Sequence, residues 1–208
     1  MPTPADEAPL RLALCQAARL LYDRGHNAPG DGNLSLRLAD GRLLCTPSGV
    51  HKGRLEPSAL VALDARGEPL DAAQRPSSEL RMHLAIYRAR PDVHAIVHAH
   101  SPHAVALTIA GVLGAVPTVP YASPTTDDVA GAVLPYARAH NAFLLERHGP
   151  VALGASLDEA LMRLEVVEHT AKIWLLARLA GPADPIAPAE LARLRSLAPP
   201  VRPPRGEG

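Results

Sequence analysis

The residues of this chain best suited to chemistry are two histidines that lie two positions apart. His98 and His100 close a short, β-branched run, Ala95-Ile-Val-His-Ala-His100. On a strand this spacing places both imidazoles on the same side of the backbone. Two imidazoles on one face form half of a tetrahedral metal site, although such a pair can also be an ordinary surface feature. Glu79, which lies a helix length upstream, is a candidate for a further ligand or a general base.

The third ligand is ambiguous from spacing alone. His148 precedes Gly149 at the end of an expected strand, where the backbone can bend towards a cleft. His169 lies in the middle of an expected helix, four residues after Glu165, as in a carboxylate–histidine pair on one helical face. The position at a strand end favours His148 only modestly, so both histidines remain candidates.

Three segments rich in small polar residues could bind an oxyanion such as a phosphate. They are Gly30-Asp-Gly-Asn-Leu-Ser35, Thr46-Pro-Ser-Gly49 and the pair Ser77-Ser78, which precedes an expected helix. Hydroxyl, amide and free helix N–H groups suit a phosphate that must bind and leave. Taken singly, each segment is also explained by ordinary turn and capping chemistry. The chain has no Walker-type glycine loop, so nucleotide binding is not indicated.

Hydrophobic periodicity predicts helices and strands that are interspersed along the chain. The helices are expected over residues 7–24, 77–90, 126–139 and 156–179, with a further helix from Pro102 onward. The strands are expected over residues 33–38, 42–46, 60–63, 93–97, 142–145 and 151–153. Ser77 or Ser78 is the expected N-cap of the second helix, and Ser156 with Glu159 forms a capping box. Several strands are joined by tight turns, which predicts a mixed, largely antiparallel sheet with helices on both faces, a three-layer α/β fold of the αβα type.

Composition limits the class of protein. The chain has 208 residues, of which 47% are hydrophobic, and we expect one domain over residues 1–198 followed by a disordered Pro/Arg-rich tail over 199–208. Lys+Arg and Asp+Glu are equal at 21 each, so no net charge favours nucleic acid or an anionic membrane. No apolar run approaches the ~20 residues of a membrane span, and the N-terminus has no signal pattern, so we expect a cytoplasmic protein.

Six short motifs, in order along the chain, resemble the class II aldolase/adducin-head family, which includes L-fuculose-1-phosphate aldolase. The resemblance extends from about Leu10 to Ala180. The motifs are Gly32-Asn-Leu-Ser35, Thr46-Pro-Ser-Gly49, Pro76-Ser-Ser-Glu79, Val97-His-Ala-His100, Pro120-Tyr121 and Arg147-His-Gly149.

This resemblance implies a complete active site. His98, His100 and His148 would bind zinc or another divalent metal, and Glu79 would be the fourth ligand at rest and the acid/base in turnover. The family's fold is the three-layer αβα arrangement, and its members form homotetramers with active sites at subunit boundaries. The residues that would hold the substrate phosphate are Gly32, Asn33, Ser48, Gly49, Ser77 and Ser78.

The resemblance favours a zinc-dependent aldolase that cleaves a phosphorylated ketose, such as L-fuculose 1-phosphate, to dihydroxyacetone phosphate and an aldehyde. The metal would act as a Lewis acid on an enediolate. Because the same metal chemistry serves other reactions, a decarboxylase of a phosphorylated 3-oxo acid or an epimerase is the second hypothesis. A non-catalytic oligomerisation module like the adducin heads is the third, and an intact Glu/His set argues against it.

One departure from the family concerns its catalytic tyrosine. The aldolases carry that tyrosine on a longer segment after the paired histidines, whereas here Ala110–Pro117 leads almost directly to Pro120-Tyr121. The acid that protonates the aldehyde oxygen therefore has no evident counterpart. We expect slow carbon–carbon cleavage, with Tyr121 as the nearest phenol in the sequence.

Overall fold

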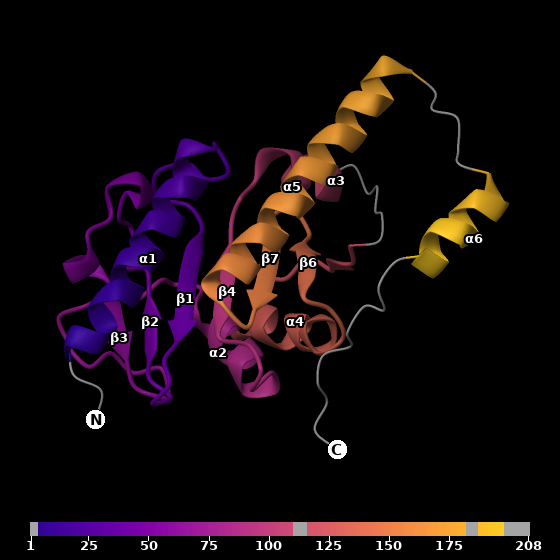
Figure 1. The fold of residues 1–208 in the computed structure, drawn as a ribbon. Coiled ribbons are helices and arrows are strands. Elements are labelled where there is room, and N and C mark those ends of the chain that lie inside the picture. The colour runs from indigo at the N-terminus through magenta and orange to yellow at the C-terminus, as the bar shows by residue number, and fades with distance from the viewer. Residues whose placement is uncertain (1–3, 110–115, 182–186, 198–208) are drawn as a thin grey trace.

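A single mixed sheet organises the part of the chain that the structure, a computed structural model, describes: residues 4–109, 116–181 and 187–197 (Figure 1). The strand order is β3-β2-β1-β4-β7-β6-β5. Every neighbouring pair is antiparallel except β5 with β6. The strands are β1 (Asn33–Arg37), β2 (Leu43–Cys45), β3 (Val61–Leu63), β4 (Ala95–His98), β5 (Thr118–Val119), β6 (Ala142–Leu145) and β7 (Gly149–Gly154).

Helices cover both faces of this sheet, which confirms the three-layer fold predicted from the sequence. α1 and α5 pack on one face and α2 and α4 on the other (Figure 1). The helices are α1 (Pro4–Asp23), α2 (Leu80–Ala89), α3 (Pro102–Ile109), α4 (Asp127–Ala139), α5 (Leu157–Ala180) and α6 (Pro188–Leu197), with 3-10 turns η1 (Lys52–Arg54) and η2 (Pro57–Ala59). None of the helices described is both long and apolar enough to cross a membrane.

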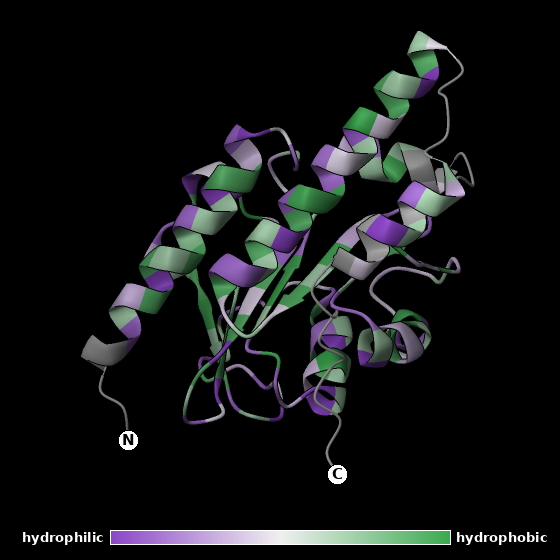
Figure 2. Ribbon diagram, turned by 45° about the vertical axis from the view of Figure 1, so that its right-hand side comes forward, coloured by the Kyte–Doolittle hydropathy of each residue, from purple (hydrophilic) through white to green (hydrophobic). Residues whose placement is uncertain are grey.

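The alternation of side chains along each strand explains the two cores. Ala95 and Val97 of β4 pack in the core beneath α1 and α5, whereas Ile96 between them packs beneath α2 and α4. Because successive residues of a strand point to opposite faces, a central strand must be apolar on both. The strands are accordingly hydrophobic, whereas the helices on either side carry both hydrophobic and hydrophilic residues (Figure 2).

The start of α2 differs from the prediction. The helix begins at Leu80, and Glu79, not Ser77 or Ser78, occupies the N-cap position. The backbone N–H of Ser77 donates instead to the carbonyl of Thr46, 3.2 Å away, which keeps this segment paired with the loop after β2. The Ser77 hydroxyl still accepts the N–H of Glu79 at 3.3 Å. Glu79 is therefore held at the end of a helix, with its side chain free to face the sheet.

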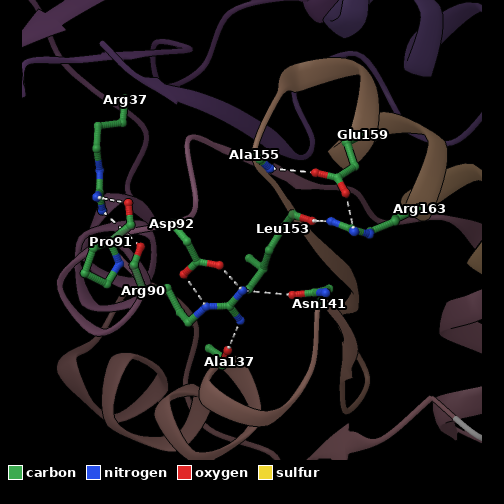
Figure 3. Close-up of polar contacts among 10 residues, drawn as sticks. All are labelled: Arg37, Arg90, Pro91, Asp92, Ala137, Asn141, Leu153, Ala155, Glu159 and Arg163. Carbon is green, nitrogen blue, oxygen red and sulfur yellow. Dashed lines mark hydrogen bonds and ion pairs between the residues drawn. The ribbon is translucent and has the colours of Figure 1, made fainter. Parts of the chain in front are cut away.

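The far end of α2 is fixed by a buried guanidinium. Arg90 pairs with Asp92 at 2.7 Å and donates to the carbonyl of Ala137 at 2.8 Å and to the side chain of Asn141 at 3.0 Å (Figure 3). These bonds tie the ends of α2 and α4 to the start of β6. Since hydrogen bonds to a charged group are worth about 1.5–3 kcal/mol each, this end of α2 is firmly anchored.

Elsewhere the predicted boundaries agree with the structure within a few residues. The capping box at the start of α5 is present, with the Ser156 hydroxyl accepting the N–H of Glu159 at 3.2 Å. The short strand β5 and helix α6 were not predicted, because neither carries a periodic pattern long enough to be recognised. The predicted tail over 199–208, and residues 110–115 of the short connection, lie outside the described residues.

Candidate metal centre

Four side chains from three separate parts of the chain meet at one end of the central strands β4 and β7. His98 is the last residue of β4, His100 follows two positions later, His148 lies in the turn between β6 and β7, and Glu79 precedes α2. One ligand atom from each lies within 4.8 Å of the ligand atoms of all the others. The structure thus brings together the four residues predicted to form a metal site. His169 is exposed on α5, where it lines a separate cavity of about 540 Å³.

The imidazole nitrogens of this cluster face one another and the carboxylate. Nε2 of His98 lies 3.4 Å from Nε2 of His148 and 3.4 Å from Oε2 of Glu79, and Nε2 of His148 lies 3.1 Å from Oε1 of Glu79. The three imidazole centroids are 4.6–5.1 Å apart. A carboxylate and three imidazoles that converge on one point suit a tetrahedrally coordinated cation. Zinc commonly binds histidine nitrogens and carboxylate oxygens in this geometry.

The hydrogen bonds around the cluster orient these nitrogens. Nδ1–H of His98 donates to the carbonyl of Pro150 at 2.8 Å, which leaves the lone pair of Nε2 towards the cluster. Nε2 of His100 is buried without a hydrogen-bond partner among the described residues. Because a buried polar atom without a partner costs about 1–3 kcal/mol, this nitrogen fits a metal ligand.

Electrostatics keep the cluster in the protonation state that a cation requires. Burial lowers the pKa of His98 to about 3 and also lowers the pKa of His100. For Glu79, burial raises the pKa, but the facing imidazoles of His98 and His148 and the amide of Asn33 outweigh this effect and hold it below its usual value. The site at neutral pH therefore presents neutral histidines at these two positions and an ionised carboxylate.

Two glycines let backbone segments approach closely at this end of the sheet. Gly149 has φ 152°, and a Cβ added there would lie 2.1 Å from the carbonyl oxygen of Ala99. Gly32 has φ 65°, and its Cβ would lie 2.7 Å from the carbonyl oxygen of His98 and 2.5 Å from the amide of Asn27. Any larger residue at either position would push apart the segments that carry the histidines.

The residues predicted to hold a phosphate fall into two groups. Ser48 and Gly49 lie beside Ser77 and Ser78, because the N–H of Ser48 bonds to the carbonyl of Arg75 and Pro47 bridges to Pro76. Ser48, Gly49 and Ser78 are exposed and Ser77 is partly so. Gly32 and Asn33 are instead buried, and Nδ2 of Asn33 donates to Glu79 at 2.5 Å. Their role in phosphate binding stays a prediction.

Three residues near the centre were not singled out from the sequence. Asn27 accepts the backbone N–H of His100 at 2.9 Å, and Asp31 faces Nδ1 of His100 at 3.5 Å. Lys52 is only 2% exposed and donates to the carbonyls of Gly30 and Val50, joining two of the predicted phosphate loops. The signal that could have indicated Asp31 is its place within the predicted segment Gly30–Ser35, and Asn27 lies three residues before that segment.

Comparison with known proteins decides the family. The family described as Class II Aldolase and Adducin N-terminal domain matches residues 12–175. This chain belongs to that family. It is 38% identical to the 3-oxo-tetronate 4-phosphate decarboxylase of Escherichia coli strain K12, over 91% of this chain and 97% of that protein.

Other members of the class II aldolase and adducin family are similar at comparable levels. The L-fuculose phosphate aldolase of Escherichia coli O6:H1 is 32% identical over 81% of this chain and 84% of that protein. The crystal structure of YgbL from Escherichia coli superposes with a TM-score of 0.81 at 36% identity, covering 91% of this chain and 99% of that one. The predicted family and fold are confirmed, whereas the reaction differs among these relatives.

Proposed function

We propose that this protein is a divalent-metal-dependent lyase that decarboxylates a phosphorylated 3-oxo sugar acid. The convergence of His98, His100, His148 and Glu79 within 4.8 Å carries the proposal, with zinc as the ion that they bind. The choice of reaction follows the relatives named as 3-oxo-tetronate 4-phosphate decarboxylases, one of which is 38% identical. The aldolase predicted first from the sequence becomes the second candidate.

The chemistry of such a substrate needs charge stabilisation and one proton. When bound, the ion supplies Lewis-acid stabilisation of negative charge on the substrate's carbonyl and neighbouring hydroxyl oxygens. In 3-oxo-tetronate 4-phosphate the C1–C2 bond breaks, CO₂ leaves, and the electron pair forms the C2–C3 double bond of an enediolate. A proton then adds at C2 and gives dihydroxyacetone phosphate. Glu79 is the group placed to deliver this proton, which its carboxylate must first take up from solvent.

The environment of Glu79 suits this role. At rest its pKa is held down by His98 and His148 and by the amide of Asn33, so the carboxylate is ionised. Once the side chain moves away from these partners, the contacts that lower its pKa are lost, and burial raises the pKa of a carboxyl. The same residue can therefore be an anionic ligand at rest and a proton carrier in turnover.

The tyrosines favour decarboxylation over aldol cleavage. CO₂ leaves without a proton, whereas an aldol reaction needs a second group to move the proton of the aldehyde oxygen. Of the chain's four tyrosines, Tyr87 is buried, Tyr136 packs against the core and Tyr22 packs edge-on against His51. Tyr121 is 60% exposed, so its phenol is available to move that proton. This exposure favours the aldolase as the second candidate function.

We also propose that the enzyme is a homotetramer and works in the cytoplasm. Large apolar side chains are exposed along α5, which supports self-association through this helix. They are Met162, Val166, Ile173, Leu176 and Leu179. Light scattering of the purified protein tests the assembly, and a monomer would contradict it.

The deciding experiment compares two substrates of the zinc-loaded protein. We expect 3-oxo-tetronate 4-phosphate to release CO₂ and dihydroxyacetone phosphate, and cleavage of L-fuculose 1-phosphate to be slower by about 10²–10⁴, as for loss of one positioned acid. Exchange of the carbon-bound protons of dihydroxyacetone phosphate with solvent, which needs only the metal and Glu79, should be measurable. Fast aldol cleavage without CO₂ release would establish the aldolase, and absence of all three reactions would favour a non-catalytic module.

A further inference from the structure

A row of polar side chains continues from the metal centre into the core between α2 and β1. Glu79, His83 and Tyr87 are spaced by four residues and so share one face of the helical segment. Across from them, Ser35 lies on β1 two residues after Asn33, on the same face of the strand. Ser35 Oγ lies 2.7 Å from Nδ1 of His83 and 2.8 Å from the hydroxyl of Tyr87.

The far end of the row is rigid. Arg37, two residues after Ser35 on β1, stacks its guanidinium 4.7 Å from the centroid of the Tyr87 ring. The same guanidinium donates to the backbone carbonyls of Arg90 and Pro91, just after α2 (Figure 3), and to the carbonyl of Tyr87 in its last turn. The row is thus anchored away from the metal centre, and its free end is the one beside Glu79.

The direction of the hydrogen bonds in the row follows from their partners. Burial raises the pKa of Tyr87, so its phenol keeps its proton, and Ser35 is the acceptor that the structure gives it. With Tyr87 donating to Ser35, the Ser35 hydroxyl proton is left to donate to Nδ1 of His83. Burial lowers the pKa of His83 to about 4, so at neutral pH the ring carries one proton. That proton is therefore on Nε2.

The Nε2–H group of His83 is left without a partner. Nε2 is buried and has no hydrogen bond to any of the residues that the structure describes. His83 follows Glu79 by one helical turn, and the carboxylate of Glu79 at rest is engaged by His98, His148 and Asn33. A buried donor without an acceptor is costly, so an acceptor brought within its reach would be stabilised there.

We propose that His83 is a positioning residue whose Nε2–H receives the carboxylate of Glu79 when that side chain leaves the metal ligands. Ser35 and Tyr87 hold the imidazole in the tautomer that this contact requires. The inference rests on the proposed function, in which Glu79 moves between a ligand position and a proton-carrying position. A buried carboxylate needs a donor in both positions, and the resting structure supplies Asn33 for the first and His83 for the second.

Two substitutions of His83 separate the donor from the ring. His83→Gln retains an N–H at a similar reach, whereas His83→Met fills the space without a donor. We expect His83→Met to lower kcat for CO₂ release roughly 10- to 100-fold, the range for a hydrogen bond to a charged group, with KM and zinc content unchanged. His83→Gln should recover most of the rate. Equal losses in both variants would show that His83 only fills space, and no loss in His83→Met would overturn the proposal.

A second measurement does not depend on activity. Nitrogen-15 NMR of the zinc-free protein reports the tautomer of each histidine, and we expect His83 to be protonated on Nε2. Ser35→Ala and Tyr87→Phe should shift it towards the Nδ1 tautomer, while Tyr136→Phe, outside the row, should not. An Nδ1–H tautomer in the unsubstituted protein would overturn the proposal even in an active enzyme. A wild-type protein without turnover would instead refute the proposed function.

Discussion

We predict that Gly149→Ala weakens the fold and the metal centre together. The new Cβ would lie 2.1 Å from the carbonyl oxygen of Ala99 and 3.1 Å from Cα of His100. Both neighbours are backbone atoms, so the contact is relieved only by moving the segment that carries His100. Overpacking costs about 1–3 kcal/mol, and the positive φ of 152° adds about 1–2 kcal/mol for a residue with a side chain.

The expected loss in the free energy of unfolding is thus about 2–5 kcal/mol. For a protein of this size, 1 kcal/mol corresponds to roughly 2–4 °C, so the melting temperature of the metal-free protein should fall by roughly 4–20 °C. Zinc affinity should fall by about tenfold or more, because a displaced His100 no longer meets His98 and His148.

Gly131→Ala is the matched control for this substitution. Gly131 lies inside α4, and a Cβ added there meets no heavy atom within 4 Å. Alanine in a helix interior is favoured over glycine by about 1 kcal/mol, so this variant should be slightly more stable and bind zinc normally. Urea unfolding and zinc titration of both variants provide the assay. A Gly149→Ala protein within about 0.5 kcal/mol of wild type in free energy of unfolding, with unchanged zinc affinity, would refute the close approach of Gly149 to Ala99.

Four further predictions concern the site. Glu79→Gln should remain folded by circular dichroism, but its turnover rate should be about 10²–10⁴-fold lower. A near-native rate would show that Glu79 has only a structural role at the start of α2. His148→Ala should abolish stoichiometric zinc binding, measured by metal analysis, while His169→Ala should not; the reverse result would reassign the third histidine. Ser78→Asp should raise KM for a phosphorylated substrate far more than for its dephosphorylated analogue, and equal effects would exclude a phosphate site there. His83 has a pKa of about 4, below that of an unfolded histidine near 6.5. Its contribution to the stability of the metal-free protein is therefore complete above pH 6.5 and is lost as the pH falls towards 4. His83→Gln should make the free energy of unfolding less dependent on pH in this window, and an unchanged pH dependence would contradict a neutral buried His83.

The sequence by itself determined the elements and most of the candidate site. Period-two and period-3.6 patterns located the principal strands and helices, since burial of one face repeats at the period of the backbone. The His98–His100 spacing and the six motifs indicated the family, which the match over residues 12–175 confirms. Local spacing could do this because each motif is a short, continuous stretch of the chain.

Only the tertiary structure decided which distant residues meet. Spacing could not choose between His148 and His169, because the choice depends on β7 lying beside β4, where His98 pairs with Val151. The N-cap of α2 was also set from outside the helix, by the bond from Ser77 to Thr46.

The polar row beneath Glu79 is a further result of the fold alone. In the sequence, Ser35 and His83 are 48 positions apart, and no pattern links them. They become partners because β1 packs against α2 and both must satisfy their polar atoms away from water. Residue type and spacing thus determine which chemistry is available, whereas strand order and helix packing determine which side chains carry it out.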